Sequence, residues 1–582
     1  MNKLLLKSVR EYKKQSILTP IFVLLEVLLE VMIPMEMAKI IDIGIAGGDL
    51  PYIIQRGFIL VVMAMLALYF GVIAGKTAAV AAAGYAKNLR HDIFYRVQEF
   101  SFKNIDHFST SGLVTRMTTD ITNVQMAYMM SLRLLARAPI MVALSWVMTL
   151  TINPRVALLF LVVIPVLGGA LIFIAKKAHP HFVKVFDEYD ILNNSVQENV
   201  NASRVVKSFV REDHEIGKFH DISKYVYRLF TRNVSKAEGI VAWNAPVMQT
   251  VVYTVIILLV AICGKSIVFG TMETGEMTSV IVYAMQIMMS LMMVTFVFVM
   301  IMIAEASTDR ITSVLTEVPE MQAKEQAVKE VADGSITFEH VDFSYAGEGG
   351  PLSLKDVNLS IKPGQTVGII GGTGSSKSTL VQLIPRLYDV TKGSVKVGGI
   401  DVREYDLEVL RDQVSMVLQK NVLFTGSIYE NIRWGNESAS NEEVERVCRL
   451  AQADGFVKEF PHGYDTMIVQ GGNNVSGGQK QRLCIARALL KRPKILILDD
   501  STSAVDTKTD ALIRKAFREE IPDTTKIIIA QRVSSIEDAD QIIVLDEGRI
   551  VGVGTSKELL RTNEIYREVY ESQMKGGEEN EQ

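Results

Sequence analysis

Six long apolar segments follow one another in the first half of the chain. A helix needs about 20 apolar residues to cross the hydrocarbon core of a bilayer. Segments of that length lie at residues 17–45, 57–83, 134–152, 156–175, 241–269 and 277–304. Beyond about Ser307 the chain reads as ordinary soluble α/β sequence. The pattern predicts a membrane all-α domain of six transmembrane helices fused to an α/β domain.

The first apolar segment is a transmembrane helix rather than a cleaved signal peptide. It is too long, it contains Glu26 and Glu30, and no small-residue cleavage site follows it. A basic amphipathic stretch precedes it and suits the inner surface of a membrane. Its five positive residues are Lys3, Lys7, Arg10, Lys13 and Lys14.

The loops between the segments predict the orientation. The short connections around Gly48, Asn153 and Thr274 carry few Lys or Arg residues, whereas the long connections 87–133 and 176–236 carry many. By the positive-inside rule, both termini and both long connections are cytoplasmic. The long connections are expected to be helical extensions of the spans. Each contains a candidate short helix, 101–108 in the first and 200–212 in the second, although a plain solvated helical hairpin also fits the periodicity.

Two features inside the membrane segments have both a structural and a functional interpretation. Glu26 and Glu30 lie on one helix face, and either pair with Lys76, Arg133 or Arg137 or serve to attract cationic cargo or couple protons. The last segment is rich in methionine, which fills cores adaptably but also suits a promiscuous binding surface. Its methionines are Met285, Met288, Met289, Met292, Met293, Met300 and Met302.

Composition limits the remaining possibilities. A chain of 582 residues is too long for one core, and 49% hydrophobic residues is high for a wholly soluble protein. The net charge of −4 and the absence of a basic stripe exclude a nucleic-acid partner. Cys263, Cys448 and Cys484 have no metal-ligand spacing, so we expect reduced, partly buried thiols.

The first functional motif of the α/β domain is a phosphate-binding loop. A strand-like run at 365–370 leads into a glycine-rich turn and then a helix with Lys-Ser at its start. Backbone N–H groups and the helix N-terminus of such a loop cradle phosphates. We expect Lys377 to neutralise the β and γ phosphates of ATP and the Ser378 hydroxyl to bind Mg²⁺. The loop residues are Gly371, Gly372, Thr373, Gly374, Ser375, Ser376, Lys377, Ser378 and Thr379.

A second motif follows further along the chain. The turn Ser476-Gly477-Gly478-Gln479 precedes a helical stretch, and then a buried strand, 495–498, ends in Asp499-Asp500. With this turn set between a phosphate-binding loop and a strand that ends in aspartate, the chain resembles the ATP-binding cassette exporters in their half-transporter form. The resemblance covers nearly the whole sequence.

The resemblance assigns roles to further residues. It implies that Tyr345 stacks on adenine, that Gln419 senses Mg²⁺ and contacts the membrane domain, and that Asp499 lies beside Mg²⁺. It also implies that the short segments 101–108 and 200–212 are coupling helices, which we call the first and second coupling segments. The stretch 501–506 matches the loop that crosses the dimer interface, and 470–472 matches the loop before the signature, with Gln470 in place of the usual glutamate.

Three further positions, all at the ATP site, depart from the pattern of the family. Ser376 stands where glycine is usual, Asp500 where a glutamate polarises the attacking water, and Gln531 where a histidine contacts the γ-phosphate. The shorter side chain of Asp500 would not reach the water, and an amide carries no positive charge. These departures predict a site that binds ATP and hydrolyses it slowly. Because the signature at Ser476 is intact, we expect a heterodimer in which this turn completes the active site of a partner half-transporter.

The expected function is ATP-driven export of amphipathic drugs, lipids or peptides from a bacterial cell, with membrane lipid around the spans. The expected domains are a transmembrane domain at 1–310, a linker at 311–334, a cassette at 335–575 and a disordered tail at 576–582. An ATP-gated or nucleotide-sensing membrane protein is the main alternative. An importer is disfavoured because cassette and membrane domain share one chain, and a peptide-processing exporter because few residues precede the first span.

Overall fold

The computed structural model describes residues 3–319, 321, 326–501 and 505–578. The chain forms two compact units, each described separately below. The membrane unit comprises Met1–Glu99 and Ser109–Glu317. The α/β unit comprises Val318–Gln582 together with Phe100–Phe108, a short segment that lies between two parts of the membrane unit in the sequence.

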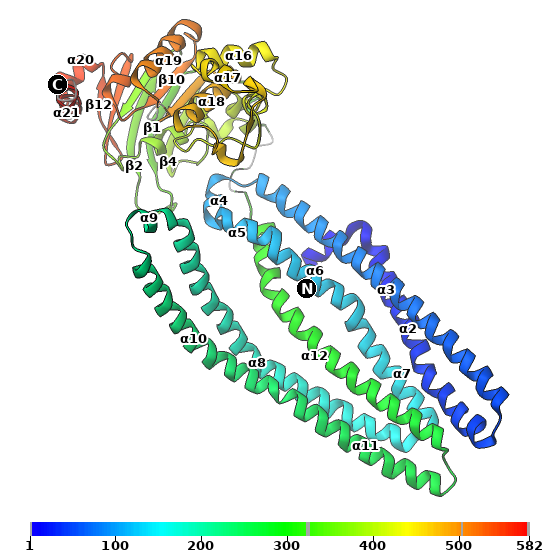
Figure 1. The fold of residues 1–582 in the computed structure, drawn as a ribbon. Helices are drawn as coiled ribbons and strands as arrows, with labels where there is room; N and C mark the ends of the chain where they lie inside the picture. The colour runs from blue at the N-terminus through cyan, green and yellow to red at the C-terminus, as the bar shows by residue number, and fades with distance from the viewer. Residues whose placement is uncertain (1–2, 320, 322–325, 502–504, 579–582) are drawn as a thin grey trace. The chain divides into compact units, whose positions relative to one another are not determined.

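The membrane unit is entirely helical (Figure 1). Within the described residues, six helical stretches are long and apolar enough to cross a membrane, which confirms the predicted fold class. They are Leu4–Ile45, Leu50–Gln98, Thr110–Ile152, Pro154–Ile174, Ala245–Val268 and Thr274–Thr316. The elements are α1 (Lys3–Leu6), η1 (Lys7–Tyr12), α2 (Lys13–Lys39), η2 (Ile40–Ile45), α3 (Leu50–Gln98), α5 (Thr110–Thr115), η3 (Arg116–Asp120), α6 (Ile121–Met130), η4 (Ser131–Leu135), α7 (Ala136–Ile152), α8 (Pro154–Asn201), α9 (Ser203–Ser208), α10 (Glu212–Ala242), α11 (Asn244–Val268) and α12 (Thr274–Thr316).

The helices continue well past the length that a bilayer requires. With 49 and 48 residues, α3 and α8 are each roughly 70 Å long at 1.5 Å per residue, which is more than twice the hydrocarbon thickness. Figure 1 shows α8 and α10 side by side, with α9 at their shared end. The helical extensions expected from the long connections are therefore present.

Each of the three short loops carries a helix start signal. Asp49 accepts a hydrogen bond from the amide of Tyr52 at the start of α3. Asn153 caps α8 in the same way, with Pro154 in the first turn, and Glu273 begins α12 with a capping box. These caps satisfy N–H groups that a helix terminus leaves without partners, so the loops can be short.

The methionines of the last span divide between the core and the surface. Met288 is buried in the cluster where α7, α8, α11 and α12 meet. Met285, Met289 and Met292 are exposed in the single chain. The core-filling interpretation therefore fits Met288, whereas a binding surface at the exposed methionines stays a prediction.

The α/β unit is built on a six-stranded, mostly parallel sheet with strand order β12-β11-β3-β10-β9-β6. A four-stranded sheet of order β2-β1-β4-β5 and the β7-β8 pair accompany it. The strands are β1 (Ile336–Phe343), β2 (Leu354–Ile361), β3 (Thr366–Ile370), β4 (Lys392–Val397), β5 (Ile400–Asp401), β6 (Val414–Val417), β7 (Gly426–Ser427), β8 (Met467–Ile468), β9 (Ile495–Asp499), β10 (Thr525–Ile529), β11 (Gln541–Asp546) and β12 (Arg549–Gly554). Every residue of β9 and β10 is buried, as expected of central parallel strands covered on both faces.

The α/β unit also contains helices and short helical turns, most of which connect these strands. They are α4 (Phe102–Phe108), α13 (Lys377–Gln382), η5 (Val402–Glu404), α14 (Leu407–Gln413), α15 (Ile428–Arg433), α16 (Asn441–Leu450), α17 (Asp454–Glu459), η6 (Gly463–Asp465), η7 (Gln470–Gly472), α18 (Gly477–Leu490), α19 (Thr507–Glu520), η8 (Val533–Ser535), α20 (Ser556–Thr562) and α21 (Glu564–Glu578). Cys448 and Cys484 are buried here and Cys263 is buried in the membrane unit, all three as free thiols.

The segment expected to be a linker, 311–334, is partly regular structure. Helix α12 continues to Thr316. Val328 forms a β-bridge with Tyr405, and Val331 is buried in the core of the α/β unit. The apolar side chains of Val328 and Val331 pack into the core of the α/β unit. The many charged residues around them made this packing hard to predict from the sequence. Residues 320 and 322–325 lie outside the described residues, as do 579–582 of the expected tail, whereas α21 extends to Glu578.

Candidate ATP-binding site

The phosphate-binding loop connects β3 to α13. Lys377 is the first residue of α13, and Ser376 precedes it with φ 71° and ψ 27°, in the left-handed region. This conformation costs a residue with a Cβ about 1–2 kcal/mol relative to glycine. The departure from glycine at this position therefore leaves the loop shape intact and stores strain next to the lysine.

The ammonium of Lys377 lies inside the loop. Its Nζ donates hydrogen bonds of 2.8 Å to the carbonyl oxygens of Gly371 and Gly372 and one of 3.3 Å to the Ser375 hydroxyl. Burial lowers the pKa of this ammonium, because a charged group loses hydration there. The carbonyl oxygens compensate the charge of Lys377 only in part. A phosphate bound in the loop would give this ammonium a negatively charged partner.

An oxygen donor pair lies beside the loop. The Ser378 hydroxyl donates a 3.0 Å hydrogen bond to Oδ1 of Asp499 at the end of β9. These residues meet because β3, β10 and β9 are adjacent parallel strands whose carboxyl ends share one edge of the sheet. Burial raises the pKa of Asp499. A hydroxyl and a carboxylate beside a phosphate loop are the kind of oxygen ligands that Mg²⁺ takes from a protein.

Asp500 is held by two amide side chains. Nε2 of Gln531 donates a 2.7 Å hydrogen bond to Oδ2 of Asp500, and Nε2 of Gln419 lies 3.5 Å from the same oxygen. Asp500 has φ 49° and is buried, and this burial raises the pKa of its carboxyl. The structure thus brings together three residues that the sequence placed after three different strands.

Tyr345 lies at the other side of the loop helix. Its hydroxyl is 3.1 Å from Oγ1 of Thr379, and its ring is half exposed. The ring packs edge-on against Phe343 and Tyr388, with centroid distances of 4.8 and 5.2 Å. An exposed aromatic face beside a phosphate loop is positioned for stacking on a base.

Tyr388 was not singled out in the sequence. Its ring contacts Phe102 as well as Tyr345, and its hydroxyl donates a 2.9 Å hydrogen bond to Asp106. Burial and this carboxylate raise the pKa of Tyr388. The first coupling segment therefore belongs to the α/β unit through an aromatic cluster that includes Tyr345. An aromatic residue in the polar run Arg386-Leu387-Tyr388-Asp389 was the only signal available.

The signature turn caps α18. Ser476 Oγ accepts from the amide of Gln479, and Gln479 Oε1 accepts from the amide of Ser476, at 3.3 and 2.9 Å. Gly477 and Gly478 form the first turn of the helix. Ser476 is exposed, and no hydrogen bond between described residues joins this turn to the phosphate-binding loop. The turn is thus held in shape by its own capping box and is open to solvent.

Two other loops flank the site. Gln470 is exposed in η7. Of the expected interface loop 501–506, residues 502–504 lie outside the described residues. Ser501 is buried, and Asp506 caps α19 by accepting a hydrogen bond from the amide of Thr509 at 2.9 Å.

The second coupling segment is an exposed turn of the membrane unit. Helix α9 occupies Ser203–Ser208, and Phe209 follows it with 73% of its surface exposed. Val210 has φ 50° and is 81% exposed, so two apolar side chains project together at the turn. Lys207 pairs with Glu212 at 3.0 Å across the base of the turn.

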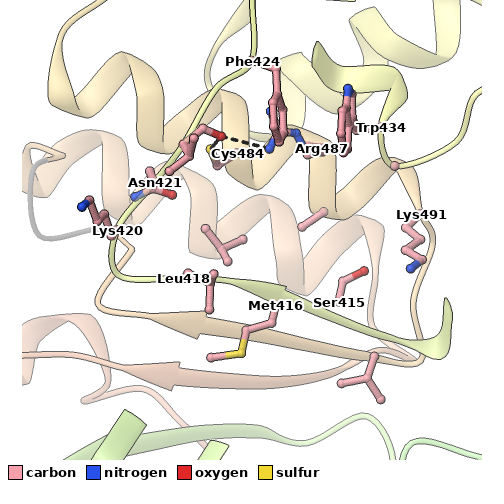
Figure 2. A pocket seen from close by; sticks show the side chains of 15 residues that line it. Ser415, Met416, Leu418, Lys420, Asn421, Phe424, Trp434, Cys484, Arg487 and Lys491 are labelled. Atoms are coloured by element: carbon pink, nitrogen blue, oxygen red, sulfur yellow. Dashed lines mark hydrogen bonds between the residues drawn. The ribbon is translucent and has the colours of Figure 1, made fainter. Parts of the chain in front are cut away.

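A groove of about 360 Å³ opens on the α/β unit next to Gln419 (Figure 2). The rings of Phe424 and Trp434 stack at 4.1 Å along its rim, and Trp434 is 64% exposed. Arg487 of α18 donates hydrogen bonds to the carbonyl oxygens of Val422 and Asn431 at 3.1 and 2.9 Å. The groove therefore has an aromatic rim and a rigid floor.

Comparison with known proteins agrees with this geometry. Residues 16–291 match the family model of the ABC transporter transmembrane region, and residues 354–503 match that of the ABC transporter. An uncharacterised ABC transporter ATP-binding protein of Bacillus subtilis, YfiB, is 37% identical over 553 residues, which cover 95% of each chain. The chain belongs to the ABC transporter family.

Other relatives refine the family assignment. An ATP-dependent lipid A-core flippase of Desulfotalea psychrophila is 31% identical over 84% of each chain. A bacterial Atm1-family ABC exporter with ATP bound has the same fold, with a TM-score of 0.86 at 24% identity over 97% of this chain and 99% of that one. The present chain carries both an ABC transporter transmembrane region and an ATP-binding cassette, formed by the α/β unit, which is the domain arrangement of a half-transporter.

Proposed function

We propose that the chain is one subunit of a heterodimeric ABC exporter and that its own ATP site binds ATP but hydrolyses it slowly. The observation that carries the proposal is the hydrogen bond between Gln531 and Asp500. It joins the position of the catalytic base to the position of the γ-phosphate sensor. Both side chains differ from those of a competent site.

The chemistry of this pair opposes fast hydrolysis. A general base typically contributes 10²- to 10⁴-fold and must lie within hydrogen-bond reach of the water. The carboxylate of Asp500 is one methylene shorter than that of glutamate, and its Oδ2 already accepts from Gln531. The Gln531 amide can donate to a phosphate but carries no charge to stabilise the transition state.

The remaining residues suit ATP binding. Lys377 and the loop amides would hold the phosphates, and Tyr345 would stack on the adenine. Ser378 and Asp499 would hold Mg²⁺, with Gln419 nearby; the ion would neutralise phosphate charge. The intact, exposed signature turn at Ser476 would cover the nucleotide of a partner half-transporter that carries the glutamate.

We also propose that the two coupling segments link the cassettes to the membrane domain. The first segment already packs on the cassette through Phe102 and Asp106. The second presents Phe209, an exposed aromatic of the kind that dominates binding when it enters a pocket. The proposed receptor of Phe209 is the corresponding groove on the cassette of the partner half-transporter. The groove beside Phe424 and Trp434 on this chain would in turn receive the second coupling segment of the partner.

The proposed cargo is an amphipathic molecule. Among such molecules we favour a lipid, because two relatives are named lipid A-core flippases. The exposed methionines of α12 supply an adaptable apolar surface. The proposed location is the cell membrane of a bacterium, with both termini in the cytoplasm, because the positive-inside rule favours the cytoplasmic side for the basic stretch and the long connections.

Reconstitution of the chain with its partner in proteoliposomes tests this function. ATP-dependent movement of a fluorescent lipid, together with steady-state ATPase, is the expected result. Hydrolysis limited to a single turnover, with no movement of lipid, would instead identify an ATP-gated or nucleotide-sensing protein.

A further inference from the structure

The membrane unit contains a charged cavity of about 600 Å³ between α2 and α3. Its apolar walls come from both helices and include Ile33, Leu68 and Val72. Two carboxylates and two cations also line it, and all four lie in or next to the membrane segments: Glu26, Glu30, Lys76 and Arg133. Charged groups at such a depth are costly unless they have partners or a function.

The two carboxylates share one guanidinium. Arg137 donates to Oε1 of Glu26 and to Oε2 of Glu30, each at 2.5 Å. Of the three partners that the sequence offered, Arg137 is therefore the one that is used. Because Arg137 engages both carboxylates, this pair of glutamates is poorly suited to attract a cationic cargo.

The other two cations have no such partner. Within the described part of the chain, neither Lys76 nor Arg133 makes a hydrogen bond or ion pair. The guanidinium of Arg133 lies above Gly75, with Nη1 3.6 Å from where a Cβ would be. The carboxylate of Glu26 lies against Gly71, one turn away on α3. Together with Arg137, which does not line the cavity but pairs with both carboxylates, the cluster has three positive and two negative side chains.

One polar atom in the wall is also unsatisfied. Oε2 of Glu26 is buried and has no hydrogen-bond partner among the described residues, and Glu26 is only 8% exposed. A buried carboxylate oxygen without a donor costs free energy. The cavity therefore has two positively charged side chains, Lys76 and Arg133, that suit an anion. Beside them, Glu26 Oε2 is a hydrogen-bond acceptor that suits a donor.

We infer that this cavity binds the head group of an amphipathic anion. A phosphate or carboxylate lies on Lys76 and Arg133, where a guanidinium and an ammonium give charge-assisted hydrogen bonds. A hydroxyl or ammonium group of the same molecule donates to Glu26 Oε2. The apolar part lies along Leu68 and Val72, which are 60% and 62% exposed. This inference rests on the proposed export function and names the class of its cargo.

Binding to the assembled transporter, without nucleotide, tests the site separately from transport. The probes are dodecyl phosphate, dodecyltrimethylammonium as the opposite charge, and inorganic phosphate as the anion without a chain. Dodecyl phosphate is expected to bind, and Lys76→Gln and Arg133→Gln are each expected to weaken that binding about tenfold. Gly75→Leu keeps every charge but fills the cavity, so it should also weaken binding.

Matched variants and melting curves separate a binding role from a folding role. Arg155→Gln removes an exposed cation outside the cavity and should leave binding unchanged, and Lys76→Arg should retain it. Equal binding of dodecyltrimethylammonium, equal binding of inorganic phosphate, or dodecyl phosphate binding that survives both Gln variants would each overturn the inference. Loss of ATP-driven transport with this binding intact would refute the export function alone.

Discussion

The hydroxyl of Tyr388 donates a 2.9 Å hydrogen bond to the carboxylate of Asp106, which fastens the first coupling segment to the cassette. The ring of Tyr388 also contacts that of Tyr345, the proposed adenine platform. One side chain thus touches both the nucleotide side of the cassette and the coupling segment.

Loss of this hydroxyl is expected to weaken coupling. Tyr388→Phe should leave ATP affinity within about twofold, since the ring remains, while cargo-stimulated ATPase should fall several-fold because a hydrogen bond to a charged group is lost. Tyr566→Phe removes a buried tyrosine hydroxyl, which donates a 2.9 Å hydrogen bond to Ser556, and serves as the control. Unchanged cargo stimulation in Tyr388→Phe would show that the bond is only structural.

The left-handed conformation of Ser376 predicts a stabilising substitution. Ser376→Gly relieves about 1–2 kcal/mol of strain, which the greater freedom of glycine in the unfolded chain offsets in part. The melting temperature of the transporter should therefore rise slightly. Ser375→Gly, at a buried neighbour without positive φ, should lower it. A lower melting temperature for Ser376→Gly would contradict the strain argument.

Phe209 is expected to anchor the second coupling segment. Phe209→Ala should separate ATP hydrolysis from transport and leave nucleotide binding intact, because the side chain is far more exposed than a folding role requires. Phe219→Ala, at a partly exposed phenylalanine on α10, is the matched control. Normal, cargo-stimulated transport by Phe209→Ala would remove the support for docking.

Single cysteines test the orientation of the spans. In a cysteine-free background, Gly47→Cys and Thr274→Cys should react with an impermeant maleimide from outside, since both positions are exposed at helix ends next to short loops. Lys103→Cys and Ser203→Cys should react only after the membrane is opened. Reaction of Lys103→Cys in intact cells would overturn the orientation.

Much of the fold was predictable because its signals are local. Six apolar segments of sufficient length predicted the spans, and a strand, a glycine-rich turn and a helix predicted the loop around Lys377. Contacts between distant parts of the sequence were less predictable. Three cations were possible partners of Glu26, and only the packing of α2 against α7 selects Arg137. The contacts of Tyr388 depend on aromatic residues from distant parts of the sequence. The cavity around Lys76 depends on the packing of α3 beside α2.

The most direct test of the central claim compares the two ATP sites of the assembled transporter. Asp500→Asn should reduce steady-state ATPase by less than about twofold, because this carboxylate is not the main general base, whereas Glu→Gln at the partner's catalytic position should reduce it by at least about 10²-fold. Ser476→Arg should also abolish turnover, since it blocks the signature turn of the competent site. Equal, near-complete losses from Asp500→Asn and the partner's Glu→Gln would show two working sites and contradict the account.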